Sequence, residues 1–196
     1  MLYLAIVSII WAFSFGIIGS SLTGVDSYLV ATLRLASASL VFLPLLRPKY
    51  IQGIDGLRLF VYGFIQFGLM YVCYMKAYQF LPSHLVALFS IFTPIYVVLI
   101  NAIRKYQFSL KYLIAALISI SGAAVIKVQG LPTGDFWIGF ALMQIAGIAF
   151  AFGQIAYRDW KYAHTSVPDS AIFALLTLGG TLCAGLFSLA LADQAS

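Results

Sequence analysis

The residues best placed to do chemistry are charged and polar side chains inside long apolar stretches. Arg34 is the clearest example, because it is the only charged residue between positions 27 and 46 and follows Asp26 by eight residues, about 12 Å along a helix. A charge at that depth in a bilayer costs about 2.5–3.5 kcal/mol on insertion scales, so we expect Arg34 to face other helices and find a partner there. It would either attract the carboxylate or phosphate of a solute, or bind backbone carbonyls and fix helix packing.

Aromatic side chains form a line through the apolar stretch at residues 59–80. The line consists of Phe64, Phe67, Tyr71, Tyr74 and Tyr78, at spacings of three and four residues that place all five on one helical face. The preceding and following stretches add Trp11, Ser14, Phe15, Phe89, Phe92 and Tyr96. These side chains either line a cavity for an amphipathic solute, or pack helices together and face lipid.

Amides and a proline complete the set. Residues at heptad spacing in the stretch 136–157 are Gln144, Gly147, Ala151 and Gln154. Amides in hydrocarbon need partners, so they either bond between helices or bind a solute. Pro94 follows Thr93 in mid-stretch and predicts a kink, because proline frees the carbonyl at Ser90. The candidate residues for binding a solute are Trp11, Ser14, Phe15, Arg34, Phe67, Tyr71, Tyr74, Thr93 and Gln144.

Other kinds of site lack their residues. All 6 acidic residues are Asp and none lies deep in an apolar stretch, which excludes a carboxylate proton relay. The sequence has no phosphate-binding loop, no metal-ligand cluster and no Ser-His-Asp constellation. Cys73 and Cys183 have neither metal-ligand nor disulfide spacing, and we expect them to be small packing residues. The sequence therefore predicts no catalytic residue, metal or cofactor.

The elements that position these residues are membrane helices. Of the 196 residues 63% are hydrophobic and 9% are charged, a composition that excludes a water-soluble globule, a disordered chain and a nucleic-acid binder. A span needs about 20 apolar residues. We predict an all-α, polytopic membrane helix bundle whose partner is the lipid bilayer. Its seven spans are residues 2–20, 27–46, 59–80, 85–103, 110–128, 136–157 and 170–191.

The distribution of basic residues predicts the orientation. Alternate connections between the spans contain Arg47, Lys49, Arg58, Arg104, Lys105, Lys111, Arg158 and Lys161, which are eight of the 11 basic residues. Basic loops stay in the cytoplasm, so we expect the N-terminus to be cytoplasmic. His84 and His164 are then on opposite sides of the membrane.

An internal repeat links the first two spans with the last two. The pentad that begins at Ala12 and ends at Gly16 is similar to the one from Ala149 to Gly153, 137 positions later, and Asp26-Ser27 recurs as Asp169-Ser170. A repeat of five spans is an odd unit, so its second copy enters the membrane upside down. Inverted repeats are typical of secondary transporters, whose sites lie between the halves near mid-membrane.

The order of several motifs resembles the drug/metabolite transporter superfamily, and specifically its EamA-domain proteins. The motifs are Trp11-Ala-Phe-Ser-Phe-Gly16, Arg34 within the second span, Ala77-Tyr-Gln-Phe-Leu-Pro-Ser83, Thr93-Pro94 and Ser121-Gly122. Such proteins have ten spans in two inverted five-helix repeats and move small metabolites across the inner membrane. The resemblance implies that residues 1–130 are a first repeat of five transmembrane helices. Residues 136–196 would be a partial second repeat of two, in a truncated chain.

The function that the resemblance implies is not enzymatic. It is secondary transport of an amino acid, amine or carboxylate by rocking of the repeats around a central cavity. Three alternatives stay open, namely a non-transporting product of a split gene, a regulatory or assembly subunit, and a membrane-embedded enzyme. The expected partners are lipid and a small-molecule solute, without nucleic acid. The small residues Ala115, Ser119 and Ala123 suit helix packing or self-association as a homodimer.

Overall fold

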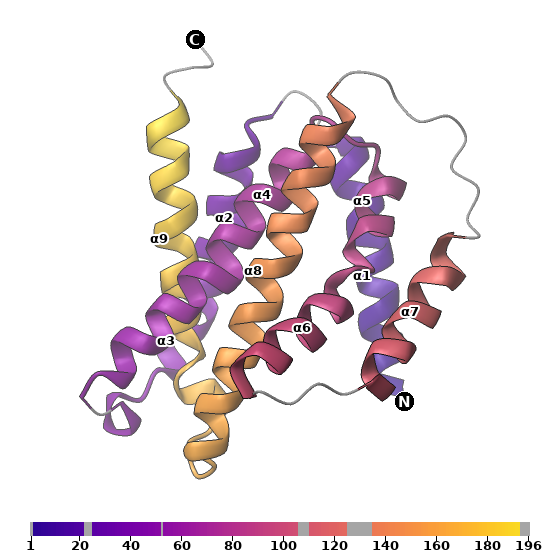
Figure 1. Cartoon of the computed structure of the whole chain (residues 1–196). Helices are drawn as coiled ribbons and strands as arrows, with labels where there is room; N and C mark the ends of the chain where they lie inside the picture. Colours follow the sequence, from indigo (N-terminus) through magenta and orange to yellow (C-terminus); the bar gives the residue numbers. More distant parts are fainter. Residues whose placement is uncertain (1, 22–24, 52, 106–109, 125–134, 193–196) are drawn as a thin grey trace.

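The chain folds as a bundle of helices whose long axes run between two ends of the molecule (Figure 1). The structure is a computed structural model that describes residues 2–21, 25–51, 53–105, 110–124 and 135–192. Within those ranges it contains helices and no strand. Five helices are long and apolar enough to cross a membrane, and a shorter apolar helix covers Leu2–Ile18. The structure therefore confirms the predicted all-α, polytopic bundle.

The predicted spans correspond to helices with small shifts at their ends. In chain order the elements are α1 (Leu2–Ser21), α2 (Ser27–Phe42), η1 (Leu43–Leu45), η2 (Pro48–Tyr50), α3 (Asp55–Gly63), η3 (Phe64–Leu69), α4 (Met70–Ala77), α5 (Ser83–Ser90), α6 (Thr93–Lys105), α7 (Leu110–Ala124), α8 (Phe136–Ala163), η4 (Asp169–Ala171) and α9 (Phe173–Ala192). Two predicted spans were too short. The span predicted at 59–80 begins with α3 at Asp55, and the span predicted at 136–157 continues in α8 to Ala163. Both extensions carry charged residues, and a span read from hydropathy stops at charges. The predicted ends at residues 128 and 130, and the side chains of Ser119 and Ala123, lie outside the described residues.

Local hydrogen bonds explain why α2 forms in an apolar setting. Asp26 caps its start, and Oδ1 accepts from the backbone N–H groups of Tyr28 at 2.6 Å and Leu29 at 3.1 Å. The hydroxyls of Thr32, Ser37 and Ser39 each donate to the carbonyl four residues earlier, at 2.8–2.9 Å. Hydroxyls satisfied by their own helix can lie in hydrocarbon without an unpaired donor.

Two of the membrane-length helices are interrupted. The helix from Asp55 to Ala77 is continuous but contains the π-helical turn η3, which inserts an extra residue between α3 and α4. The next helix breaks at Ile91 and Phe92, and Pro94 lies in the first turn of α6, where proline is tolerated. The freed carbonyl of Ser90 accepts the hydroxyl of Thr93 at 2.7 Å.

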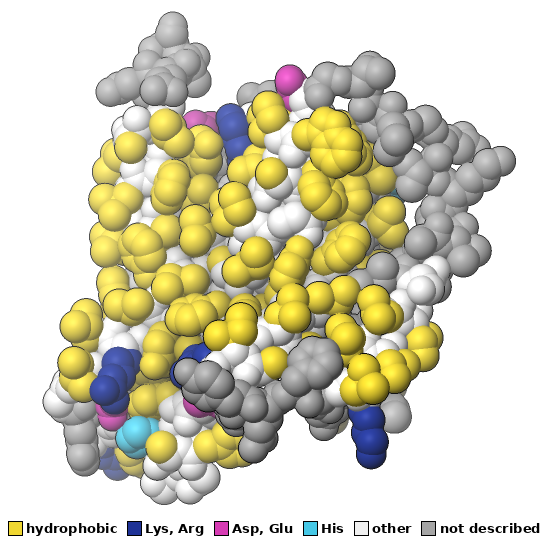
Figure 2. Space-filling model, in the orientation of Figure 1, with side chains coloured by type: hydrophobic (Ala, Val, Ile, Leu, Met, Phe, Trp, Pro, Cys, Tyr) yellow, Lys and Arg dark blue, Asp and Glu magenta, His cyan; other side chains and the backbone are white. Residues whose placement is uncertain are grey.

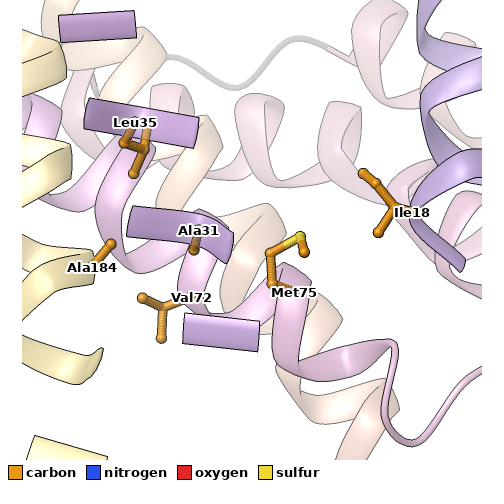
Figure 3. Close-up of a cluster of buried hydrophobic side chains, with 6 residues drawn as sticks. All are labelled: Ile18, Ala31, Leu35, Val72, Met75 and Ala184. Carbon is orange, nitrogen blue, oxygen red and sulfur yellow. The ribbon is translucent and has the colours of Figure 1, made fainter. Parts of the chain in front are cut away.

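The core lies where α2, α9, the helix from Asp55 to Ala77, and α8 pack together. Helices α3 and α9 approach closely because both have glycine at the contact. A Cβ atom on Gly63 would lie 1.9 Å from the carbonyl oxygen of Leu176, and one on Gly179 would lie 2.1 Å from that of Phe60. Figure 3 shows a buried cluster nearby that joins α2, α4 and α9, and to which α1 contributes only Ile18.

The surface is apolar along the sides and charged at the ends. Figure 2 shows hydrophobic side chains over most of one face, with most of its lysines and arginines at the lower end. Helix α1 lies at the edge of the bundle and packs mainly against α5, and its first twelve described residues are all exposed. An apolar helix exposed on all sides is suited to lipid or to further protein, and not to water.

Candidate solute-binding site

Arg34 lies on α2 beside the buried face of that helix and is exposed in the structure. Its guanidinium carbon is 5.5 Å from the centre of the Tyr71 ring on α4, within the range of a cation–π contact. Among the described residues no carboxylate is within ion-pair distance of Arg34. The arginine is thus positioned by an aromatic ring, and its N–H donors stay available to an anion.

Three tyrosines, two on α4 and one at its C-terminal cap, continue from that contact as a ladder. The rings of Tyr71 and Tyr74 are 6.0 Å apart and those of Tyr74 and Tyr78 are 5.3 Å apart, both edge to face. The hydroxyls of Tyr74 and Tyr78 are hydrogen-bonded at 2.9 Å, and Tyr78 reaches the carbonyl of Phe15 on α1 at 3.5 Å. The Phe15 ring contacts Tyr74 at 5.9 Å. A cation and rings with polar tips therefore share one surface between α1, α2 and α4.

The other candidate residues on α1 and on the helix from Asp55 to Ala77 differ in their surroundings. Phe67 lies in η3, and its ring is 5.7 Å from that of Phe173 on α9, so it packs between helices. Trp11 is 57% exposed and Ser14 is half-buried, one residue before Phe15. The first two members of the aromatic line drawn from the sequence, Phe64 and Phe67, thus lie within the π-helical turn, and the tyrosines follow it.

Thr93 and Gln144 belong to a second group, at the contact of α6 with α8. Tyr96 donates to Oε1 of Gln144, whose Nε2 donates to the carbonyl of Phe140 at 3.3 Å. A Cβ atom on Gly147 would lie 3.0 Å from the Tyr96 ring and 3.6 Å from Oγ1 of Thr93. The Gln144 amide is thus satisfied between helices, which is one of the two roles expected for it. Tyr74 packs against two clusters of buried residues, one that contains Val72 and Met75 and one that contains Met143 of α8.

The structure also shows a polar cavity that the sequence did not indicate. It has a volume of about 470 Å³ and is lined by Gln66, Val97, Gln154, Ile155, Tyr157, Arg158, Lys161, Tyr162 and Asp169. Gln154 was noticed as a member of a heptad series and Arg158 as one of the basic residues that predict the orientation, whereas Gln66 was not singled out. An amide near the middle of the apolar stretch 59–80 was the available signal for Gln66. Its neighbours on α8 are far away in the sequence, so no spacing could connect them.

Ion pairs and one histidine–carboxylate contact lie at the end of the bundle where the basic residues gather. Lys161 pairs with Asp169 at 3.1 Å, Arg104 with Asp159 at 3.5 Å, and His164 Nε2 is 3.2 Å from Asp55 Oδ2. The Tyr157 hydroxyl donates to Asp169, and this hydrogen bond, helped by Lys161 and opposed by burial, holds the pKa of Asp169 below its usual value. These pairs tie the turn between α8 and α9 to the rest of the bundle.

The long apolar helices, the charged ends and the mid-helix arginine together define a polytopic α-helical membrane protein. A family model described as the EamA-like transporter family matches residues 1–128, and the chain belongs to that family. The sequence resemblance is thereby confirmed, and the chain belongs to a family of transporters rather than of enzymes. No solved structure matches the chain at a significant level.

Curated relatives are named for one solute. The chain is 38% identical over 191 residues to a "Probable biotin transporter" of Pseudomonas aeruginosa, covering 94% of this chain and 65% of that protein. It is 36% identical over 188 residues to a "Biotin transporter" of Escherichia coli, covering 94% and 62%. It is 34% identical over 189 residues to one of Salmonella typhimurium, covering 95% and 62%. The chain thus spans less than two thirds of the length of these relatives.

Proposed function

We propose that this protein carries a small organic carboxylate across the membrane as a secondary transporter, and that biotin is the first candidate solute. The observation that carries the proposal is identity of 34–38% to three proteins named as biotin transporters. The geometry supports a carboxylate over an amine, because the charges inside the predicted spans, Arg34 and Lys76 among them, are cations and no acidic residue lies deep in a predicted span.

The proposed site is the surface formed by Arg34, Tyr71, Tyr74, Tyr78 and Phe15. In this proposal the guanidinium binds the carboxylate while the ring of Tyr71 keeps it in place. The tyrosine ladder offers flat apolar faces with hydroxyl tips, which suits a solute that has a carbon skeleton and polar groups. Phe15 couples α1 to this surface, so a change in the position of α1 would change the shape of the site.

The arrangement in the membrane is part of the same proposal. We place residues 1–130 in a first repeat and 136–196 in an inverted second repeat, with the N-terminus in the cytoplasm and the protein in the bacterial inner membrane. Helix α8 runs opposite to α1 and α9 opposite to α2 (Figure 1), as inversion requires. Consecutive spans alternate in direction, so any two helices five spans apart run in opposite directions. The observed directions are therefore those that inversion requires, and they also follow from the number of spans.

Uptake of radiolabelled biotin tests the proposal directly. Cells that neither make nor import biotin would express the full-length protein, the Arg34→Gln variant or the Arg34→Lys variant, with membrane content checked by immunoblot. We expect uptake by the wild type, a loss of at least about tenfold in Arg34→Gln, and partial recovery in Arg34→Lys, because a lost charge pairing costs more than 2 kcal/mol. Excess unlabelled amino acid, amine and carboxylate competitors identify the solute class.

The outcomes separate a binding role from a packing role. Normal uptake by Arg34→Gln would remove Arg34 from the site, and loss of the protein from the membrane would assign it to helix packing. If cells with the wild-type protein accumulate one of the competitors but no biotin, that competitor would replace biotin as the proposed solute, and the proposal of transport would stand.

A further inference from the structure

We propose that the cavity between η3, α6 and α8 is a second binding site for the same class of solute, an organic anion with N–H donors at its neutral end. This inference rests on the proposed function and adds to it a place where the solute is held near the basic end of the bundle. It involves Gln66, Gln154 and Arg158, none of which belongs to the Arg34 surface.

The cavity has the size and depth that such a site needs. Its volume of about 470 Å³ lies within the range of pockets for small molecules. Gln66 lies 11 residues into the helix that begins at Asp55, about 16 Å from that end, whereas Lys161 is close to the last residue of α8. The cavity therefore connects the charged end of the bundle with roughly the middle of a span. Val97 and Ile155 give it apolar walls between these polar ends.

The cations at its mouth are held in place. Nη2 of Arg158 donates to Oδ1 of Asn101 at 2.8 Å and to Oδ1 of Asp159 at 3.2 Å, whereas its Nε is buried and has no hydrogen-bond partner. Lys161 donates to the carbonyl of Val167 and pairs with Asp169. Two cations and one carboxylate line the cavity, and beside it Arg104 offsets the charge of Asp159, so the local charge is positive and favours an anion. An arginine fixed by its neighbours loses little freedom on binding one.

One of the residues that line the cavity, Gln66, has a buried amide oxygen that is unsatisfied. Gln66 is 6% exposed, and its Oε1 has no hydrogen-bond partner among the described residues. Its side chain packs against α8 at Gly153, where an added Cβ atom would lie 2.2 Å from Cβ of Gln66 and 2.9 Å from Oε1. A buried acceptor without a partner is costly, and a donor on a ligand would relieve that cost. A solute with an amide or urea N–H opposite its carboxylate fits both ends of the cavity.

Equilibrium binding to the purified full-length protein in lipid nanodiscs tests the charge requirement. The probes are biotin, which has a carboxylate and a cyclic urea, and biotinamide, which lacks the charge. We expect Arg158→Gln to weaken biotin binding at least tenfold, Arg158→Lys to weaken it less, and biotinamide binding to change little. Arg104→Gln is the matched control, because Arg104 pairs with Asp159 at the same end but does not line the cavity.

The amide prediction uses the same assay. We expect Gln66→Leu, which keeps the bulk but removes the acceptor, to weaken biotin and biotinamide equally. Thermal unfolding of each variant without ligand shows whether the fold is retained. Variants at Arg158 and Gln66 that fold normally and bind both probes like the wild type would overturn the inference.

A second measurement is independent of biotin and so separates this inference from the proposed function. A cysteine at the exposed position Gln154 is labelled with an anionic sulfonatoethyl or a cationic trimethylammonioethyl methanethiosulfonate, with the parent protein, whose Cys73 and Cys183 are buried, as the blank. We expect faster labelling by the anionic reagent and loss of that preference with Arg158→Gln. If the wild type binds no biotin but the Gln154→Cys variant shows the preference, biotin would be refuted as the solute and an anion site supported. Equal rates for the two reagents would contradict the site.

Discussion

Helices α1 and α8 contain similar pentads, Ala12 to Gly16 and Ala149 to Gly153, yet their surroundings are opposite. On α1, Phe13 is 68% exposed and Gly16 has no atom within 4 Å of an added Cβ position. On α8, Ala151 is fully buried and Gly153 is in contact with Gln66. The comparison shows that an apolar pattern specifies a membrane helix, whereas neighbouring helices decide whether its residues pack, face lipid or line a site.

The largest contrast is expected at Met143 of α8 and Ile6, which occupies the corresponding position of α1 at the offset of 137 residues. Met143 is 3% exposed and packs with Leu85 and Phe136, whereas Ile6 is 45% exposed. Met143→Ala should destabilise the protein by about 2–5 kcal/mol because it leaves a cavity, and Ile6→Ala by less than about 0.5 kcal/mol. Unfolding in mixed micelles followed by circular dichroism measures both. Equal losses would mean that α1 is packed as closely as α8.

The glycines of the two pentads give the next contrast. Gly153→Ala should cost about 1–3 kcal/mol, because the new methyl group would overlap Cβ of Gln66 and force the helices apart. Gly16→Ala meets open space and should be neutral or slightly stabilising, since alanine is the better helix former. The same unfolding assay compares them. A tolerated Gly153→Ala would show that η3 can move away from α8.

A smaller effect is expected for the amide of α8. Gln144→Leu removes the bond from Tyr96 and should cost about 0.6 kcal/mol, the average for such bonds in membranes. Val7→Leu is the control at the corresponding position of α1, which is exposed. A double-mutant cycle with Tyr96→Phe isolates the pair. A coupling near zero, with solute binding reduced, would assign Gln144 to the solute instead of to packing.

The smallest effect concerns pH, and it arises where α8 contacts Asp169 of η4 through Tyr157 and Lys161, whereas α1 contains no charged residue. The hydrogen bond from Tyr157, with the pairing to Lys161, lowers the pKa of Asp169 from its usual 3.8, so the folded state stabilises the charged carboxylate. This contribution is present above the unfolded-state pKa and is lost as pH falls through the lowered one. The side chain is 65% exposed, so Asp169→Asn should cost less than about 0.5 kcal/mol at pH 7. A difference from the wild type that persists at about pH 2 would assign the effect to packing.

The sequence predicted the helices well because membrane spans depend on length and hydropathy, which are local properties. Arg34 and its aromatic neighbours could also be proposed, since a charge in an apolar stretch and a periodic row of rings are visible in one segment. The polar cavity could not be found in this way. Gln66 meets Gly153 and Arg158 meets Asn101 only because particular helices pack together, and single segments do not reveal that packing.

The π-helical turn at Phe64–Leu69 determines what the deletion of one residue would do to this protein. Its extra residue sets the rotation of α4 relative to α3, since one residue of an α-helix turns the chain by about 100°. Deleting a single codon in this turn would restore an ordinary helix and swing Tyr71, Tyr74 and Tyr78 away from Arg34 together. The same rotation would turn Val72 and Met75 out of the buried cluster that α4 shares with α2 and α9, so the extra residue sets the core packing and the arginine–tyrosine contact together.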